Sequence, residues 1–168
     1  MTPTDHALGS HDARVTVVEY GDFECPICKQ AAPAVRLLLH RFRDRIRFVY
    51  RHFPLEEIHP HAFSAAEAAE CVGAQGKFWP MHDLLFESQP HFKPPQLRAC
   101  ADRLQVDLRR YAADLDDHLF VQRIREQMAG GQASGVRSTP GFFVNGEIQD
   151  VSFGMEDLFD AVEAKLRE

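Results

Sequence analysis

Two cysteines separated by two residues stand where the sequence can support redox chemistry. Cys25 and Cys28 occur in the segment Cys25-Pro26-Ile27-Cys28, between a strand-like run and a helix-like run. The first turn of a helix has unpaired backbone N–H groups and partial positive charge, and both stabilise a thiolate. Such a thiolate attacks a disulfide, and the second thiol resolves the mixed disulfide. The spacing therefore predicts dithiol–disulfide exchange, with Cys25 as an exposed nucleophile and Cys28 as a covered resolving cysteine.

The same pair admits two other interpretations, a half-site for zinc or a pair of inert cysteines. A zinc site needs two further ligands, and Cys71 and Cys100 do not form a second close pair. These two cysteines stand in helix-like segments, where small core residues are expected, although a second disulfide or a shuttle role stays open. His59 and His61 are expected at a helix entry or on the surface. No metal site is therefore predicted.

Two further positions can take part in thiol chemistry. Glu19 lies in an otherwise apolar strand, shortly before Cys25. A buried carboxyl has a raised pKa and can exchange a proton with Cys28, whereas a Glu that faces solvent at a sheet edge has no such role. Pro140 follows Thr139 just before a strand, which makes it a candidate cis-proline, with a trans loop proline as the alternative.

The segments on either side of the cysteines have regular patterns. β-branched and apolar residues at 14–20 (RVTVVEY) and at 45–53 (RIRFVYRHF) predict two buried strands. Between them, residues 26–42 show helical spacing, with Pro26 in the first turn, where its missing N–H costs nothing. A strand, a helix and a strand in succession indicate a right-handed parallel βαβ unit.

The rest of the chain is helical at first and then returns to strands. Helical stretches are predicted at 61–72, 77–87, 95–104, 108–114 and 117–133. Residues 141–144 and 147–152 then flank Asn145-Gly146, a strong signal for a two-residue hairpin turn, and a helix at 156–166 follows. The order β-α-β, helices, β-β-α predicts an α/β fold with a mixed sheet and an all-helical insertion.

Three segments resemble the DsbA-like branch of the thioredoxin superfamily. Residues 17–28 (VVEYGDFECPIC) resemble its active-site segment, and residues 138–146 (STPGFFVNG) resemble its cis-proline segment and hairpin. Between them, 75–79 (QGKFW) and the residues that follow resemble part of its helical insertion. The resemblance implies an N-terminal tail at 1–12, a thioredoxin-like core at 13–57 and 136–168, and a helical insertion at 58–135.

The resemblance also implies a role for single residues. By this likeness Cys25 is the nucleophile, Cys28 is the resolving cysteine and Glu19 is the buried acid of the site. Substrate contacts are implied for Thr139, the cis-proline Pro140, Pro26 and Ile27. The backbone of Thr139 would pair with a substrate strand beside Cys25.

Two departures from the family pattern affect the expected activity. Well-known oxidising members carry Pro-His between the cysteines, and this chain carries Pro26-Ile27. A His there helps to hold the thiolate, so its absence weakens the expectation of strong oxidising power. Thr139 before the proline and the lack of a secretory signal favour reduction or isomerisation. The basic partner of the buried acid is not evident, and Arg51 is the candidate.

Composition narrows the class of partner and the compartment. The chain has 168 residues, which fits a single domain of ordinary size. Its net charge of -6 argues against a nucleic-acid partner, because phosphate binding needs a clustered basic face. Residues 1–11 are polar and show no secretory signal, and no membrane span is expected. We therefore expect a cytoplasmic protein with no membrane partner.

The sequence predicts a protein dithiol–disulfide oxidoreductase that acts on protein or peptide thiols and disulfides through Cys25 and Cys28. The redox-active disulfide is the only cofactor-like group expected, with glutathione or another thiol as the unidentified electron donor or acceptor. The alternative is a redox-sensing peptide-binding module or holdase, in which the pair gates a groove without turnover.

Overall fold

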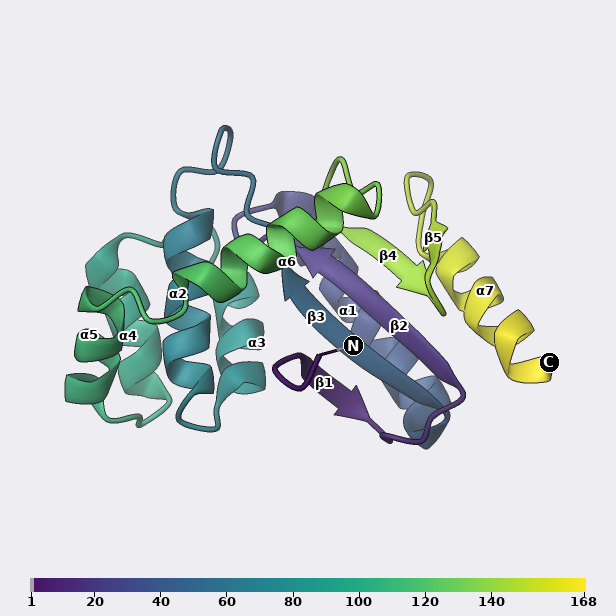
Figure 1. The fold of residues 1–168 in the computed structure, drawn as a ribbon, viewed down its shortest axis with the longest axis horizontal. Helices are drawn as coiled ribbons and strands as arrows, with labels where there is room; N and C mark the ends of the chain where they lie inside the picture. The colour runs from purple at the N-terminus through teal and green to yellow at the C-terminus, as the bar shows by residue number, and fades with distance from the viewer. Residues whose placement is uncertain (1) are drawn as a thin grey trace.

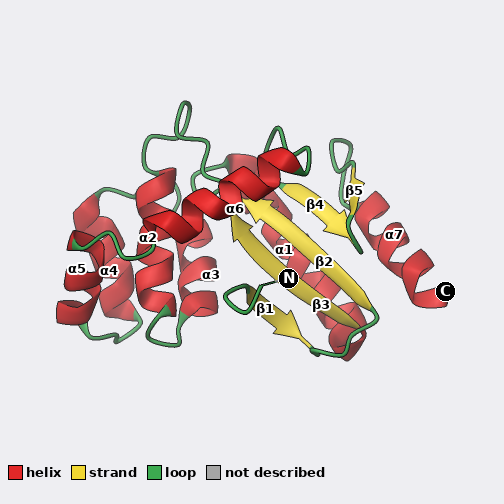
Figure 2. Cartoon of the chain, viewed as in Figure 1, coloured by secondary structure: helices red, strands yellow, loops and turns green. Residues whose placement is uncertain are grey.

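A mixed sheet forms the centre of the molecule, and helices cover both of its faces (Figures 1 and 2). The computed structural model describes residues 2–168. Within that range the strands are β1 (His6–Gly9), β2 (Val15–Gly21), β3 (Ile46–His52), β4 (Gly141–Val144) and β5 (Glu147–Gln149). The helices are α1 (Pro26–Phe42), α2 (Ala62–Gly73), α3 (Phe78–Ser88), α4 (Pro94–Arg103), α5 (Leu108–Asp116), α6 (Val121–Ala133) and α7 (Glu156–Arg167), with a 3-10 turn at Arg43–Arg45.

The strand order β1-β3-β2-β4-β5 places β2 in the middle of the sheet. β2 and β3 run parallel, with Glu19 opposite Tyr50, and all other neighbouring strands run antiparallel. The β-α-β half and the β-β-α half are therefore joined in one mixed sheet, and the predicted fold class is confirmed. The helix α1 has the bounds that its sequence pattern predicted.

Alternate residues of the central strands point to opposite faces of the sheet. On one face, Val17 and Phe48 pack in the same core cluster as Leu38 of α1. On the other face, Tyr20 packs in a separate cluster with Met128 of α6. This alternation determines which side chains of β2 lie beneath α1.

The helix α6 lies across the second face of the sheet (Figure 1). Its residue Gly131 approaches two rings so closely that a Cβ atom would come within 2.8 Å of Phe53 and 3.0 Å of Tyr20. A side chain at this position would hold the helix away from the sheet. The last helix of the expected 58–135 insertion therefore also covers the core.

The helices α2 to α5 pack on one another beside the sheet, at the left of Figure 1. α2 contacts each of the other three, and its buried residues Ala65, Ala68 and Ala69 allow close approach. Cys71 and Cys100 are buried in this unit as free thiols. They occupy small core positions, as their sequence context predicts.

A short strand at the N-terminus differs from the expectation of a tail at 1–12. β1 pairs antiparallel with β3 along the edge of the sheet. Its first residue, His6, stacks on Phe78 with ring centroids 3.5 Å apart, and its Nε2 lies 2.9 Å from a carboxylate oxygen of Glu70. The four residues of β1 are too few and too polar to show the alternating pattern that predicts a strand. Pairing with β3 and these long-range contacts hold the strand in place.

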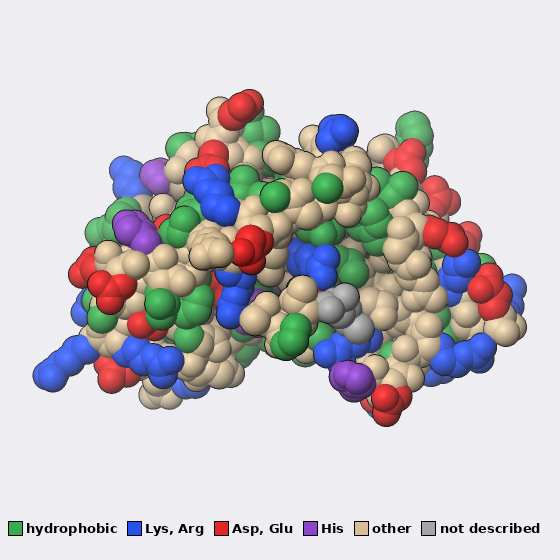
Figure 3. Space-filling model, in the orientation of Figure 1, with side chains coloured by type: hydrophobic (Ala, Val, Ile, Leu, Met, Phe, Trp, Pro, Cys, Tyr) green, Lys and Arg blue, Asp and Glu red, His purple; other side chains and the backbone are tan. Residues whose placement is uncertain are grey.

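The surface carries charges of both signs. Acidic and basic side chains are interspersed on the face shown in Figure 3, which agrees with the modest net charge of -6. Among residues 2–168, no helix has both the length and the apolar character that crossing a membrane requires.

Candidate active site

Cys25 lies at the mouth of α1. It is the N-cap residue of that helix, its backbone is extended, and Pro26 occupies the first turn. The backbone N–H groups of Ile27 and Cys28 stabilise negative charge on its sulfur. Cys25 and Cys28 are both free thiols in this structure. The start of α1 is therefore a site that can hold a thiolate.

The nucleophile is more covered than the sequence suggested. Cys25 was expected to be exposed, but only 4% of it is accessible, because the loop at Thr139 and Pro140 lies over it. In its protonated form the Cys25 thiol donates a hydrogen bond to the carbonyl oxygen of Thr139, with a distance of 3.4 Å between the sulfur and the oxygen. The Thr139–Pro140 peptide bond is cis. Pro26 and Ile27 are exposed beside this contact.

The two thiols have opposite acidities. The pKa of Cys25 falls to about 5, first of all because the Cys28 thiol donates a hydrogen bond to its sulfur. The backbone N–H groups of Ile27 and Cys28 at the start of α1 act in the same direction. Burial raises the pKa of Cys28 well above its ordinary value. At neutral pH the site therefore holds a thiolate at Cys25 and a protonated thiol at Cys28.

Glu19 lies beneath α1, on the same face of the sheet as Val17. It is 3% exposed. Burial raises its pKa to about 8, and the negative charge of Cys25 adds to the rise. A negative charge on Glu19 in turn raises the pKa of Cys28, so the two groups lie close enough to influence one another. The carboxyl is therefore neutral at pH 7 and placed to exchange a proton.

Arg51 is not the partner of Glu19. In the parallel register Glu19 pairs with Tyr50, and Arg51 pairs with Tyr20 on the opposite face of the sheet. The Arg51 guanidinium donates hydrogen bonds to the Asp5 carboxylate and to the Tyr20 hydroxyl. Since side chains alternate along a strand, a residue one position from the correct register cannot reach the α1 face.

Asp22 holds the turn that leads to Cys25, a role that the sequence did not reveal. Its buried carboxylate accepts hydrogen bonds from the backbone N–H of Glu24 at 2.7 Å and of Leu55 at 2.9 Å. The Nδ1 atom of His59 lies 2.7 Å from the same carboxylate. The loop after β3 is thereby tied to the active-site turn. An Asp followed by turn residues is a common local pattern, so its long-range partners had no sequence signal.

Gln89 is a second residue that sequence reasoning missed. It follows α3 in the helical insertion, and its side-chain amide donates hydrogen bonds to the carbonyl oxygens of Phe23 and Cys25. These two carbonyls flank the start of α1. The insertion therefore helps to fix the position of the nucleophile.

A groove borders the cis-proline loop. It has a volume of about 340 Å³ and is lined partly by Val136, Pro140 and Ile148. Ile148 is 58% exposed, and the nearby Phe153 is 96% exposed. Contiguous exposed apolar surface, unlike single exposed side chains, marks places that bind other molecules. This surface lies next to Thr139, which covers Cys25.

No metal-binding arrangement is present in the part of the chain that the structure describes. Among residues 2–168, no group of three or more His, Cys, Asp or Glu side chains is arranged to hold a metal ion. The chemistry that the described residues support is thiol chemistry at Cys25 and Cys28.

Comparisons with known structures show the same architecture. A family model described as thioredoxin matches residues 1–164. A thioredoxin-like oxidoreductase from Silicibacter pomeroyi superimposes with a TM-score of 0.88 and 27% identity, over 99% of this chain and 95% of that one. BdbD from Bacillus subtilis superimposes with a TM-score of 0.87 and 24% identity, over 98% of this chain and 94% of that one. The thiol-disulfide exchange protein alpha-DsbA2 from Wolbachia pipientis superimposes with a TM-score of 0.85 and 17% identity, over 96% of this chain and 87% of that one.

Curated relatives with similar sequences are named Na(+)/H(+) antiporters. A Na(+)/H(+) antiporter NhaA 1 from Salinispora arenicola is 51% identical over 158 residues, which are 94% of this chain and 24% of the relative. A Na(+)/H(+) antiporter NhaA from Herminiimonas arsenicoxydans is 38% identical over 163 residues, 97% of this chain and 26% of the relative. The chain thus spans about a quarter of the length of these relatives, and their names describe the whole proteins.

We expect Cys25 to titrate with a midpoint near pH 5, because the Cys28 thiol donates to its sulfur. The ultraviolet absorbance of the thiolate in the reduced protein measures this midpoint. Cys28→Ala removes the donor and should raise the midpoint, whereas Cys28→Ser keeps a hydroxyl donor and should hold it low. Equal midpoints in the two variants would show that this hydrogen bond does not set the acidity.

We expect Glu19 to lower the stability of the reduced protein as the pH rises. Above the ordinary Glu pKa of 4.5 the unfolded chain ionises, while the folded carboxyl stays protonated up to about 8. The free energy of unfolding therefore falls across this window. Glu19→Gln should be more stable than the native protein at pH 8 by up to a few kcal/mol, since one pKa unit is about 1.4 kcal/mol.

Urea unfolding of the two reduced proteins below pH 4.5 and at pH 8 measures this difference. Glu87→Gln, an exposed change of the same kind on α3, serves as the control and should show no such pH dependence. A Glu19→Gln effect of equal size at both pH values would contradict the raised pKa.

Proposed function

We propose, on the premise that this chain belongs to the thioredoxin family, that it exchanges disulfides with protein or peptide substrates through Cys25 and Cys28. The resemblance to DsbA-like proteins is confirmed by the family match and the superposed structures. The observation that carries the proposal is the pairing of an acidic thiol at the start of α1 with a buried, protonated thiol one turn later.

The proposed reaction begins with the Cys25 thiolate. It attacks one sulfur of a substrate disulfide, the second substrate sulfur leaves, and a mixed disulfide forms. Glu19 loses its own proton once the Cys25 charge has gone, and Cys28 then gives its proton to the Glu19 carboxylate. Cys28 attacks the Cys25 sulfur, which releases the first substrate sulfur and closes the Cys25–Cys28 disulfide. Two molecules of a monothiol such as reduced glutathione return the pair to the thiol state, the first by forming a mixed disulfide and the second by releasing it as oxidised glutathione. The reverse sequence oxidises a substrate dithiol.

The substrate is proposed to bind across the cis-proline loop. The backbone of Thr139 would pair with an extended substrate segment, which would displace the Cys25 thiol from the Thr139 carbonyl. The exposed residues Pro26 and Ile27 and the groove lined by Pro140 would contact its side chains. Such a site selects extended, apolar segments because backbone pairing gives affinity and the groove gives selectivity.

The acidity of Cys25 indicates the direction of exchange. Thioredoxin combines a cysteine pKa of about 7 with a potential of about -270 mV, and DsbA combines about 3.5 with about -120 mV. A lower thiolate pKa stabilises the reduced pair by about 1.4 kcal/mol per unit, or about 30 mV. A Cys25 pKa of about 5 lies between these two values, so we expect a potential between about -270 and about -120 mV. An intermediate potential favours isomerisation and exchange with glutathione.

We expect the purified protein to speed the reduction of insulin by dithiothreitol, and its cysteine pair to equilibrate with glutathione at a potential between about -270 and about -120 mV. The turbidity of insulin measures the rate of its reduction. Alkylation with mass readout of Cys25 and Cys28 in glutathione buffers measures the redox potential of the pair. Cys25→Ser should lose the acceleration completely. If wild type and Cys25→Ser perform alike, the chain has no turnover, and the alternative of a redox-sensing binding module takes the place of this proposal.

The relatives named Na(+)/H(+) antiporters suggest a setting for this chemistry. A segment like this chain makes up about a quarter of each of them. We therefore propose that a membrane transporter is among the physiological partners of the chain. Such a partner would offer thiols or disulfides at the membrane surface, where the exposed groove beside Pro140 could reach them.

Trapping tests the transporter partner. Cys28→Ala cannot resolve a mixed disulfide, so partners should stay bound to Cys25 in cells and be released by dithiothreitol. Mass spectrometry of the released proteins is expected to find a membrane transporter. The double variant Cys25→Ser with Cys28→Ala is the control and should release none. Release of soluble proteins alone would contradict the proposed partner and leave the exchange activity standing.

A further inference from the structure

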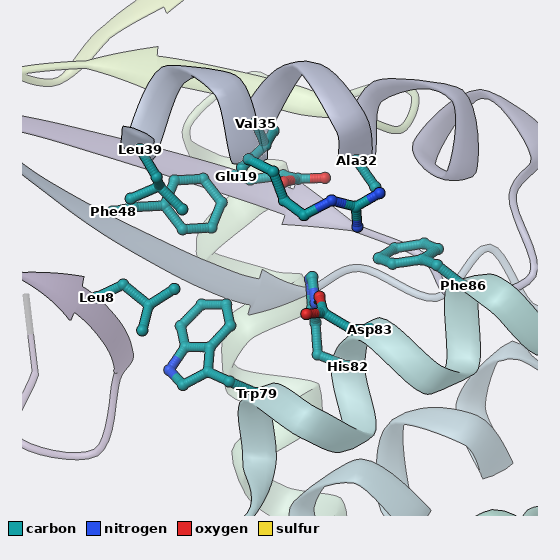
Figure 4. Close-up of a pocket in the computed structure, with 11 residues that line it drawn as sticks. Leu8, Glu19, Ala32, Val35, Leu39, Phe48, Trp79, His82, Asp83 and Phe86 are labelled. Atoms are coloured by element: carbon teal, nitrogen blue, oxygen red, sulfur yellow. The ribbon is translucent and has the colours of Figure 1, made fainter. Parts of the chain in front are cut away.

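A cavity connects the buried carboxyl of Glu19 with the surface of the molecule (Figure 4). It has a volume of about 70 Å³ and lies between α1, α3 and β1. Glu19 borders it from the sheet, while Arg36 of α1 and Asp83 of α3 border it and are themselves accessible to solvent. The remaining wall is largely apolar and includes Leu8, Ala32, Val35, Leu39, Phe48, Trp79 and Phe86. We call this space the Glu19 cavity.

The carboxyl of Glu19 needs this cavity for its polar contacts. Among residues 2–168, no group donates a hydrogen bond to it, although only 3% of the residue is accessible. A buried carboxyl without a donor is costly. The cavity is large enough for more than one water molecule, since a water needs about 10–15 Å³. Water in the Glu19 cavity would satisfy the carboxyl and give its proton a route to move.

His82 stands at the far side of the same cavity. Its Nδ1 atom lies 2.9 Å from a carboxylate oxygen of Asp83, and its Nε2 atom is buried without a hydrogen-bond partner. Burial lowers the pKa of His82 below its ordinary value, so the ring is neutral at pH 7. In Figure 4, His82 and Asp83 lie across the cavity from Glu19. A neutral imidazole beside a half-exposed carboxylate can both accept and give a proton.

We propose that the Glu19 cavity is the route by which the proton of the resolving step travels between Glu19 and solvent, with Asp83 and His82 as its outer relay. The inference rests on the proposed exchange activity and adds to it the path and the residues that complete the proton transfer. Asp83 and His82 act through Glu19 and water, so they are positioning residues and do not contact the substrate.

The proton balance of the step defines what the cavity must do. Once the mixed disulfide has removed the charge of Cys25, Glu19 releases its own proton to water in the cavity. The S–H bond of Cys28 then breaks, and its proton forms an O–H bond on the Glu19 carboxylate. The Cys28 thiolate attacks the Cys25 sulfur, the Cys25–Cys28 bond forms, and the substrate leaves as a thiolate. Glu19 then returns its proton to water in the cavity, and Asp83 passes it to bulk solvent. In the oxidising direction the same proton enters by this route.

Other charged and titratable groups around Glu19 support this timing. Cys25 and Cys28 face it from α1, Tyr50 faces it from β3, and Asp22 lies in the turn after β2. The Cys25 thiolate helps to raise the pKa of Glu19, and its charge disappears when the mixed disulfide forms. Glu19 therefore releases its proton more easily at the stage when Cys28 needs a base. Arg36, at the edge of the cavity, instead acts on His82 and helps to lower the pKa of that ring.

The two thiol steps can be timed separately with 5,5′-dithiobis(2-nitrobenzoate). Cys25 attacks this disulfide and releases a first thionitrobenzoate, and Cys28 then displaces the second one from the mixed disulfide. Ala32→Leu narrows the cavity without removing a charge, and Asp83→Asn removes the outer carboxylate. Asp83→Glu restores a carboxylate, and Glu87→Gln removes a charge from α3 outside the cavity.

The expected result is a second release about tenfold slower in Ala32→Leu and in Asp83→Asn, with the first release unchanged. A general base contributes roughly 10²–10⁴-fold, so partial loss of its proton route has a smaller effect. Asp83→Glu and Glu87→Gln should keep the native rate and the native pH profile of the second release. If Ala32→Leu fails to fold, Asp83→Asn and its pH profile decide the matter.

Two contrary results are distinguishable. If the native protein releases both thionitrobenzoates, and Asp83→Asn and folded Ala32→Leu match it in rate and pH profile, the proton route is wrong and the exchange activity stands. If the native protein releases only one, Cys28 does not resolve the mixed disulfide. That outcome overturns the proposed function together with the inference that rests on it.

Discussion

The position of β2 at the centre of the sheet is the constraint on which the site depends. Hydrogen bonds to β3 on one side and β4 on the other fix its register and direction. The strand then ends at Gly21, where a Cβ atom would come within 2.5 Å of the Tyr50 ring, and the chain turns toward Cys25. A shift of one residue would move Glu19 to the α6 face and leave Cys28 without an acid beside it.

Burial disfavours more than one negative charge in the site at a time. Cys25, Cys28 and Glu19 share a region with little access to water, where like charges interact strongly. The start of α1 supplies hydrogen bonds for only one of them, so the thiolate at Cys25 is favoured while the other two groups stay protonated. When Cys25 enters a disulfide, the charge can pass to Glu19 or Cys28. The order of chemical steps thus follows from electrostatics.

Local patterns were sufficient to predict the strands β2 to β5, the helix α1 and the cysteine pair. Pro26 marks a helix start by its fixed backbone angle, and the Asn145-Gly146 turn marks a hairpin by its left-handed angles. They were not sufficient for features made by distant contacts. Arg51 had the right charge to neutralise Glu19, yet the alternation of the strand turns it to the other face. Gln89 and His82 reach the site from the insertion, and no spacing in the sequence links them to Cys25.

The helical insertion is therefore part of the site and not only an addition to the core. α3 contacts α1 directly, and it supplies His82 and Asp83 at the Glu19 cavity, while Gln89 binds the carbonyls on either side of the helix start. Burial is the largest cause of the raised pKa of Glu19. Because Trp79 and Phe86 of α3 line the Glu19 cavity beside residues of α1 and the sheet, the insertion shares in the burial that separates the acidities of the site.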